Sequence, residues 1–234
     1  MSFIELDFIS SYPQEIIAVD EVGRGPLVGP VVIGAVRILI NHRSEFDFFL
    51  HQLKIFEIND SKKLSARKRE EILKKLNIEM FDFKKSSTIK LAGVEIDFVT
   101  WQMTPEIIDQ ENILWASLRG MKEACLNLSK EKNSKTTVLI DGHKKFKWDN
   151  LKSPFHEIPI IKGDSKSLLI GLASIIAKEK RDLYMRELHE IYPDYGFKTH
   201  FGYPTKMHRE AIKKFGPTPE HRKTFKGVKE FLPS

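Results

Sequence analysis

Residues 16–39 read IIAVDEVGRGPLVGPVVIGAVRIL, and the centre of the fold can be inferred from them. Two runs rich in Val and Ile, residues 16–22 and 31–39, flank a segment of Gly and Pro. Such runs are typical of β-strands, and a short Gly/Pro connection between them predicts an antiparallel pair. The first run ends on two neighbouring carboxylates, Asp20 and Glu21. This pair permits three interpretations: a nucleotide-cofactor loop, a solvated strand end, or half of a metal site beside a polymer-binding loop.

Strand patterns continue to alternate with helical patterns along the chain. Further strands are predicted over residues 79–87, 136–140 and 157–162. Helices are predicted after Ser65, which can act as an N-cap, after Pro105, and over residues 165–192. Five strands alternating with helices indicate an α/β fold, a mixed sheet flanked by helices on both faces.

The last part of the chain has a different character. From residue 193 onward Pro and Gly interrupt the sequence around a short basic helix near residues 205–215. We therefore expect a main domain over residues 1–192 and a small helical C-terminal extension over residues 193–234.

Composition is that of a globular protein outside the membrane. The 234 residues are 41% hydrophobic and 30% charged, and no apolar run approaches the length of a membrane span. The N-terminus lacks the basic start of a signal peptide, and Cys125 is the only cysteine, so no intrachain disulfide can form. We expect a cytoplasmic protein, a monomer, with no membrane partner.

The net charge of +6 comes entirely from the tail. Residues 195–234 hold nine Lys and Arg against three Asp and Glu, whereas residues 1–194 hold 29 of each. Aromatic residues and histidines are interleaved with these charges, a mixture that suits phosphates, sugars and bases. A nucleic-acid partner is one interpretation, and a solvated helical face is the other.

Acidic residues follow three of the predicted strands: Asp20 with Glu21, then Asp141, then Asp164. Strand ends on one edge of an open α/β sheet meet in space. Four carboxylates there would repel one another unless cations lay between them. Oxygen ligands without a Cys or His cluster favour hard ions, and we expect Mg²⁺ or Mn²⁺, with two ions roughly 4 Å apart suiting phosphodiester hydrolysis.

Each acid also has a simpler interpretation. Asp141 can be a turn residue before Gly142, Asp164 can cap the following helix, and the first pair can be solvated. Adjacent residues of a regular strand also point to opposite faces, so Asp20 and Glu21 can share a site only if the backbone bends, a freedom that the glycines beyond them can supply.

The glycines do not make a dinucleotide-binding loop. That loop must open a helix whose N-terminus faces the pyrophosphate. Here Pro26, Pro30 and a β-branched run follow instead. Gly23 and Gly25 would rather let backbone N–H groups approach a sugar-phosphate chain, with Arg24 nearby as a cation.

Taken in order, the motifs of this chain resemble those of bacterial type 2 ribonuclease H, the ribonuclease HII family. The matching segments cover nearly the whole length: VDEVGRGPLVGPVV from residue 19, DSKKLSARKREE from 60, LIDG from 139, KGDSKS from 162, ASIIAKEKRD from 173, YPDYGF from 192, HFGYPTKMH from 200 and GPTPEHR from 216. The resemblance implies a ribonuclease H-like fold with a five-stranded mixed sheet and a C-terminal extension that closes over nucleic acid.

The resemblance also implies an activity. Members of the family are endonucleases that cut the RNA strand of RNA–DNA hybrids and nick duplex DNA 5′ of embedded ribonucleotides, leaving a 3′-hydroxyl and a 5′-phosphate. By motif match, the catalytic and metal-binding residues are Asp20, Glu21, Asp141 and Asp164. Asp182, inside the long helix, is not carried over as a ligand.

The substrate-binding residues implied are those of the loop, Gly23, Arg24 and Gly25, which would read the 2′-hydroxyl, and Tyr203, which would pack at the RNA-to-DNA junction. The 2′-hydroxyl is what distinguishes RNA from DNA at a given site. Lys62 and Lys63 would hold phosphates, although both can equally be plain surface lysines.

Three positions depart from the family pattern. Phe201 stands where the family usually has Lys or Arg, Pro204 where it has Gly, and Glu179 where it has an apolar residue. These departures put affinity in question rather than activity, since none touches the four acids. The terminal KEFLPS is too short to assign a docking motif for a replication clamp.

Two other functions fit the same residues. One is a metal-dependent nuclease of the same fold that cuts DNA, and the other is a non-catalytic module that binds hybrids. The acids argue against the second, because a pure phosphate binder would do better without them.

Overall fold

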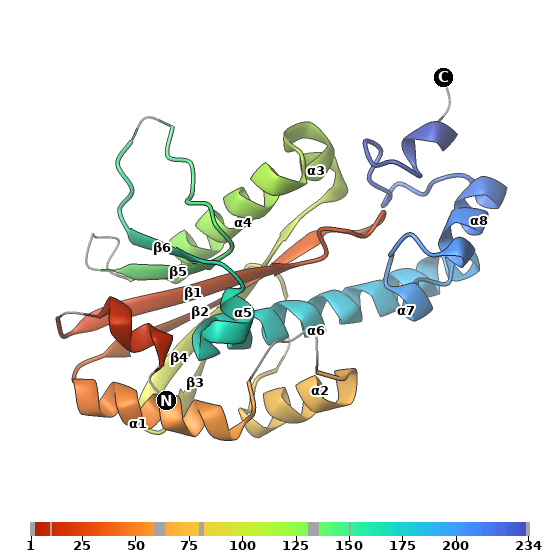
Figure 1. Ribbon diagram of the computed structural model, residues 1–234. Helices are drawn as coiled ribbons and strands as arrows, with labels where there is room; N and C mark the ends of the chain where they lie inside the picture. Colours follow the sequence, from red (N-terminus) through yellow and green to blue (C-terminus); the bar gives the residue numbers. More distant parts are fainter. Residues whose placement is uncertain are drawn as a thin grey trace.

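The computed structural model describes residues 3–9, 11–58, 64–79, 82–130, 136–149 and 151–232. Its centre is a mixed six-stranded sheet in the order β3-β4-β2-β1-β5-β6 (Figure 1). The strands are β1 (Gln14–Val22), β2 (Val31–Ile40), β3 (Ser87–Leu91), β4 (Val94–Met103), β5 (Thr137–Asp141) and β6 (His156–Ile160).

The predicted antiparallel pair is confirmed. β1 and β2 pair antiparallel from Gln14↔Ile40 to Val22↔Val32, and β1 pairs in parallel with β5 up to Val19↔Ile140. The strands β5 and β6 are also parallel. Because parallel neighbours end at the same edge, the carboxyl ends of β1, β5 and β6 lie together.

The sheet has six strands, not five, and the strand predicted over residues 79–87 is wrong. The described residues 82–86 form a turn and a loop, and a hairpin of β3 and β4 follows. Its two-residue turn consists of Ala92 and Gly93, with φ of 53° and 85°. A turn with two positive φ angles favours Asn-Gly or Gly-Gly. Because Ala92, and not Asn or Gly, occupies the first turn position, the sequence pattern did not predict the hairpin.

The helices match the predictions in part. They are α1 (Arg43–Ile55), α2 (Ala66–Lys75), α3 (Pro105–Glu111), α4 (Ile113–Leu128), α5 (Gly163–Lys166), α6 (Leu168–Ile191), α7 (Phe197–His200) and α8 (Lys206–Phe215), with short 3-10 turns at Ile4–Phe8, Pro193–Tyr195 and Lys229–Phe231. Ser65 caps α2 as predicted, its hydroxyl accepting from the N–H of Lys68 at 3.2 Å. The helix predicted after Pro105 is broken at Asn112, whose φ is 64°. Among the described helices, none is long and apolar enough to cross a membrane.

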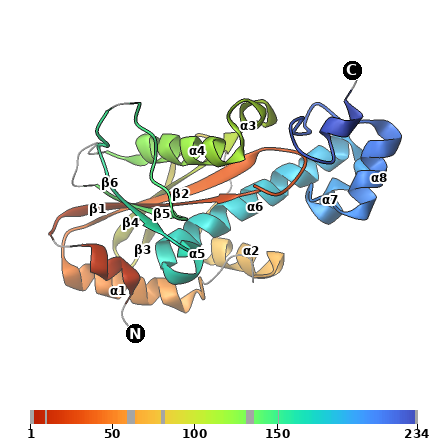
Figure 2. The same cartoon turned by 45° about the horizontal axis from the view of Figure 1, so that its top comes forward.

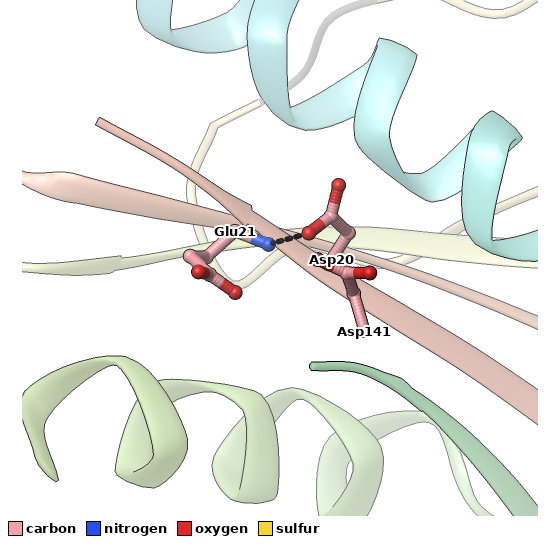
Figure 3. Close-up of side chains that lie close together, drawn as sticks. All are labelled: Asp20, Glu21 and Asp141. Atoms are coloured by element: carbon pink, nitrogen blue, oxygen red, sulfur yellow. Dashed lines mark hydrogen bonds between the residues drawn. The ribbon is translucent and has the colours of Figure 1, made fainter. Parts of the chain in front are cut away.

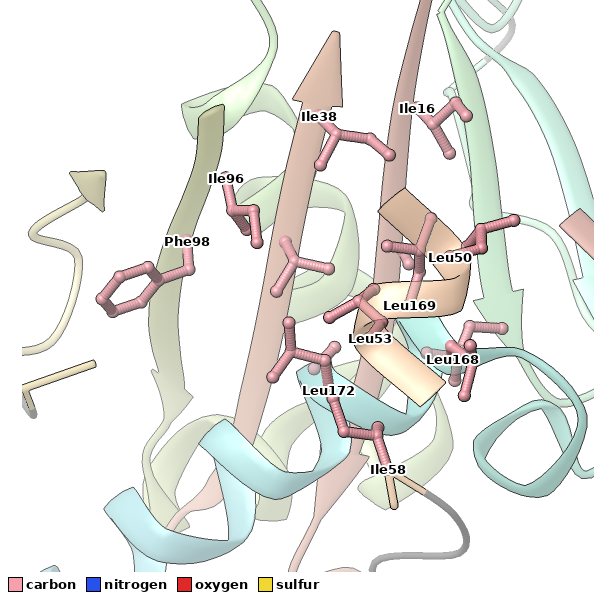
Figure 4. Packing of buried hydrophobic residues seen from close by; sticks show 14 of the residues in the cluster. Ile16, Ile38, Leu50, Leu53, Ile58, Ile96, Phe98, Leu168, Leu169 and Leu172 are labelled. Atoms are coloured by element: carbon pink, nitrogen blue, oxygen red, sulfur yellow. The ribbon is translucent and has the colours of Figure 1, made fainter. Parts of the chain in front are cut away.

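Two layers of helices cover the sheet. The alternation of β1 sends Ile16 and Ala18 into a core shared with α1, α2 and α6, and Ile17 and Val19 into a core shared with α3 and α4. Figure 4 shows the first core, where Leu172 of α6 packs among the side chains of the sheet and of α1. Such two-sided burial explains why residues 16–19 of β1 and most of β2 are continuously apolar.

The residues from Pro193 onward share a third core with the rest of the chain. Leu27 and Val28, between β1 and β2, and Met185 of α6 are buried with Phe197 and Val228 of this part. Figure 2 shows α7 and α8 at the far end of α6, beside the β1–β2 connection. An isolated bridge, Val28↔His221, ties the two segments together. The C-terminal residues therefore form part of the wall around the glycine-rich connection.

Candidate metal centre and substrate cleft

Three of the four predicted acids meet at the edge where β1 and β5 end. One carboxylate oxygen from each of Asp20, Glu21 and Asp141 lies within 4.8 Å of the others. Figure 3 shows the three side chains gathered between α4 and α6. Hard divalent cations take such oxygen ligands, and carboxylates this close favour a shared cation.

The backbone does not bend between the two neighbouring acids. β1 continues to Val22, and Glu21 is still the partner of Ile33 in the β1–β2 register. The pairing of β1 with β5, however, stops at Val19↔Ile140. Beyond that point side chains from both faces of β1 can reach around its edge. The glycines are therefore not needed to bring Asp20 and Glu21 into one site.

The electrostatics of Asp20 favour a bound cation. Burial raises the pKa of its carboxyl well above the usual value, and the charges of Glu21 and Asp141 raise it further. The N–H of Glu21 donates to Oδ1 at 2.7 Å, whereas the buried Oδ2 accepts no hydrogen bond from any group in the part of the chain that is described. A buried carboxylate oxygen without a donor is costly. A divalent ion would both satisfy that oxygen and remove the repulsion.

Asp141 is oriented by the start of α5. Its Oδ1 accepts the N–H of Gly163 at 2.6 Å. A Cβ at Gly163 would lie 3.2 Å from that oxygen and 2.6 Å from Ile170 Cδ1, so a larger residue there would disturb the contact. The carboxylate is thus held by a backbone donor rather than left as a solvated turn residue.

Asp164 follows Gly163 directly but lies outside the group of three. It is 5% exposed, within α5. The capping role considered for Asp164 belongs to Ser167, whose hydroxyl accepts the N–H of Ile170 at 3.2 Å. The capping interpretation of Asp164 is therefore wrong, and its position directly after Gly163 keeps it close to Asp141 in the fold.

The glycine loop and Tyr203 lie against each other. A Cβ at Gly25 would be 3.5 Å from Tyr203 Cε1, and the Tyr203 side chain is exposed. Gly23 has φ of 96°, a conformation that favours glycine. Arg24 is exposed and donates to Glu21 Oε1 at 3.3 Å. The predicted loop therefore reaches the acids through Arg24, and Tyr203 lies against the loop at Gly25.

Lys62 and Lys63, the remaining predicted substrate-binding residues, lie outside the described residues.

Some cleft residues escaped the sequence analysis. The cleft that holds Glu21, Arg24 and Asp141 is closed by side chains of α4, among them Leu114 and Ser117, and by His143 and Lys144 after β5. The apolar spacing of α4 indicated only a core helix. No local pattern shows that one end of such a helix faces a cleft, because that depends on how the helix crosses the sheet.

Two of the residues that depart from the family pattern, Phe201 and Glu179, contact charged side chains. The Nζ of Lys178 lies 4.9 Å from the ring centroid of Phe201, so a cation is still close to this position. Glu179 forms ion pairs with Arg186 and Arg69. Asp182, not expected as a metal ligand, is buried and forms ion pairs with Arg69 and Lys178.

Comparisons with known proteins cover nearly the whole chain. The family model for ribonuclease HII matches residues 17–228. The ribonuclease HII of Fusobacterium nucleatum is 45% identical over 214 residues, 91% of this chain and 86% of that protein. The ribonuclease HII of Desulfotalea psychrophila is 42% identical over 217 residues, 93% of this chain and 83% of that protein.

The fold is similar to that of a solved ribonuclease. The crystal structure of ribonuclease H2 from Pyrococcus horikoshii OT3 superposes with a TM-score of 0.62 and 25% identity, covering 93% of this chain and 96% of that one. A model match over most of the chain, relatives above 40% identity and a shared fold lead to one conclusion. The chain belongs to the ribonuclease HII family and is a ribonuclease H, an endonuclease.

Proposed function

We propose that the protein hydrolyses the RNA strand of RNA–DNA hybrids and nicks duplex DNA on the 5′ side of embedded ribonucleotides, leaving a 3′-hydroxyl and a 5′-phosphate. The observation that carries the proposal is the group of three carboxylates within 4.8 Å of one another, beside the Gly25–Tyr203 contact. Acids suited to metal and a loop suited to a sugar-phosphate chain lie in one cleft.

Asp20, Glu21 and Asp141 would hold the metal, with Asp164 as a fourth ligand. Mg²⁺ or Mn²⁺ suits this all-oxygen set. When bound, the metal supplies an activated water and stabilises the charge that develops on the phosphate. On binding metal, Asp20 would lose its proton. Glu21 would lose its contact with Arg24. The N–H of Gly163 would keep Asp141 in place. The Arg24 guanidinium is then available to the substrate.

Recognition of the ribonucleotide falls to the loop and to Tyr203. Gly23 and Gly25 have no side chains to keep a sugar away, so backbone groups of the loop can approach the 2′-hydroxyl. The Tyr203 ring, next to Gly25, would pack on the neighbouring sugar at the junction with DNA. Phosphates further away would be held by Lys62, Lys63 and the basic C-terminal residues, so affinity should fall with salt.

The test is cleavage of a labelled DNA duplex that contains one ribonucleotide, with and without divalent cation, with the cut mapped at nucleotide resolution. We expect a single cut 5′ of the ribonucleotide, only when metal is present. Cleavage without metal, or on the 3′ side, would contradict the proposal.

Two further samples separate the other functions. An all-DNA duplex cut at the same rate would identify a DNA nuclease. An Asp141→Asn protein that cuts as fast as wild type would show that the acids are not used.

A further inference from the structure

Two fully buried arginines lie beneath the glycine-rich connection between β1 and β2. Arg181 comes from α6 and Arg222 from the C-terminal residues, and each is 0% exposed. Within the described ranges neither forms an ion pair with a carboxylate. A buried guanidinium without an anion is unusual, because removing a charge from water is costly unless its donors are satisfied.

Backbone carbonyls of the connection satisfy these donors. Arg222 donates to the carbonyls of Gly23 at 2.6 Å, Pro26 at 2.8 Å, Arg24 at 3.0 Å and Gly29 at 3.0 Å. Arg181 donates to the carbonyls of Val28 at 3.2 Å and Pro30 at 3.3 Å, and to that of Phe201 at 3.0 Å. The two guanidinium groups thus donate hydrogen bonds to carbonyls along the connection, from Gly23 to Pro30.

In this arrangement the carbonyl groups and the N–H groups of the loop differ in whether they are hydrogen-bonded. The carbonyl oxygens of Gly23 and Arg24 accept from the Arg222 guanidinium, whereas the N–H groups of Gly23, Arg24 and Gly25 donate no hydrogen bond to any group in the described part of the chain. Backbone N–H groups left without a partner are ready donors for a ligand oxygen. Next to the acids, the segment is thus held through the carbonyls of Gly23 and Arg24, and its N–H groups stay unused.

Steric fit makes the arrangement specific. A Cβ at Gly23 would lie 2.2 Å from Arg181 Nε, so this position accepts no side chain while Arg181 stays in place. The planar guanidinium places five N–H donors on three nitrogens in a fixed geometry, so it spans carbonyls that the compact ammonium of lysine cannot reach together. The two cations also repel each other, and burial and this repulsion lower the pKa of Arg222 to about 9. The hydrogen bonds to the carbonyls offset the cost of burying two cations side by side.

We infer that Arg181 and Arg222 are positioning residues: they fix the Gly23–Gly25 segment in the conformation that accepts a ribose 2′-hydroxyl, and thereby set the preference for a ribonucleotide over a deoxyribonucleotide. This inference rests on the proposed function. It adds that the selectivity of the loop is built by two side chains that need not touch the substrate.

The experiment measures this preference directly. Binding is measured in the Asp141→Asn background, by fluorescence anisotropy, for a duplex with one ribonucleotide and for the same duplex in DNA alone. Arg222→Lys keeps the charge but loses the planar guanidinium. We expect the affinity ratio between the two duplexes to fall about tenfold, the loss of roughly one good hydrogen bond to the 2′-hydroxyl. Arg186→Lys on α6, an exposed arginine that pairs with Glu179 and not with the loop, is the matched control and should leave the ratio unchanged.

A ratio separates positioning from simple loss of folded protein, since an inactive fraction lowers both affinities equally. Arg181→Lys is the second variant, measured in the same way if Arg222→Lys is not recovered folded, and is expected to lower the ratio too. An unchanged ratio in a folded Arg222→Lys or Arg181→Lys protein overturns the inference. If the Asp141→Asn protein itself shows no preference for the ribonucleotide duplex and the wild type does not cut it, the proposed function fails instead.

Discussion

Gly34 is the partner of Asp20 across the β1–β2 ladder, and its missing side chain lets α6 pack directly against the sheet at the level of that acid. A Cβ at Gly34 would lie 2.1 Å from the carbonyl oxygen of Ala173. The next residue of α6, Ser174, has its hydroxyl close enough to Asp20 to lower the pKa of the carboxyl, against the larger effect of burial. The close approach of helix and strand therefore determines how deeply Asp20 is buried.

Gly34→Ala should weaken both the fold and the site. Because the clash is with backbone, no side-chain rotation relieves it, and overpacking of this kind costs about 1–3 kcal/mol. We expect a lower midpoint in urea unfolding, together with weaker divalent-metal binding measured by calorimetry. An unchanged midpoint would mean that α6 can shift without cost.

Local patterns predicted the elements whose chemistry is local. The antiparallel pair, the Ser65 cap and the basic helix near residues 205–215 all follow from short-range signals, and all are found. The hairpin at Ala92 and the break at Asn112 were missed, since each depends on a positive φ at a residue that does not require one. At Asn112 the break is stabilised locally, because the side-chain oxygen caps α4 and accepts the N–H of Leu114 at 3.0 Å.

For the site too, local sequence signals predicted some features and missed those that depend on long-range contacts. Acids at strand ends identified the cleft, but the distance between Asp20 and Asp141 depends on the parallel register of β1 and β5, which no local pattern contains. Arg181 and Arg222 were missed entirely as contacts of the loop, because their partners lie far away in the chain. The sequence indicates which residues carry chemistry, and the packing determines which of them meet.

Added divalent cation should stabilise the protein through the three acids. Metal that binds only the folded state raises the free energy of unfolding by about 2.7 kcal/mol at a hundredfold excess over Kd. We expect Mg²⁺ or Mn²⁺ to raise the melting temperature, EDTA to reverse the change, and Asp141→Asn to lose most of it. Asp194→Asn, at an exposed acid away from the cleft, is the control. An equal shift in both variants would place the ion elsewhere.

Stability should fall in mild acid because of two buried histidines. The N–H of Thr218 donates to His221 Nδ1 at 2.9 Å, so His221 donates through Nε2 to His208 Nε2 at 3.1 Å, and His208 Nδ1 donates to the Tyr203 carbonyl at 3.0 Å. This chain of bonds requires both rings to be neutral. Burial accordingly lowers the pKa of His208 to about 4 and that of His221 to about 3.

The sign of the effect follows from the unfolded chain, whose histidines take up protons near pH 6.5. Below that pH the unfolded state binds more protons than the folded state. Stability therefore declines from about pH 6.5 towards pH 3–4, by up to about 1.4 kcal/mol per pH unit for each histidine. In urea unfolding at several pH values, His221→Gln should be less stable than wild type at pH 7.5 but have a shallower slope below pH 6.5. His156→Gln, at an exposed position, should keep the wild-type slope.

Tyr203→Ala should impair cleavage next to a single ribonucleotide. The exposed ring lies against Gly25, and stacking on an aromatic side chain contributes about 1–3 kcal/mol. We expect kcat/KM on the single-ribonucleotide duplex to fall at least fivefold, whereas Tyr203→Phe, which keeps the ring, should retain most of it. Tyr192→Ala, beyond the end of α6, is the control for loss of a tyrosine outside the cleft. Wild-type rates for Tyr203→Ala would exclude ring packing as part of recognition.

Lys144→Ala should reduce the electrostatic part of substrate binding. Lys144 lines the cleft together with Arg24, Glu21 and Asp141, so its ammonium can contact a phosphate that enters beside those carboxylates. Each phosphate contact contributes about 0.9 to the slope of log affinity against log salt. Anisotropy titrations at several salt concentrations should therefore show a slope shallower by about one for Lys144→Ala, equally on ribonucleotide-containing and all-DNA duplexes, because a phosphate contact carries no sequence or sugar information. Lys145→Ala, the exposed neighbour that does not line the cleft, is the matched control. The same change of slope in both variants would mean that the lysines act only through net charge, and not through a contact beside the acids.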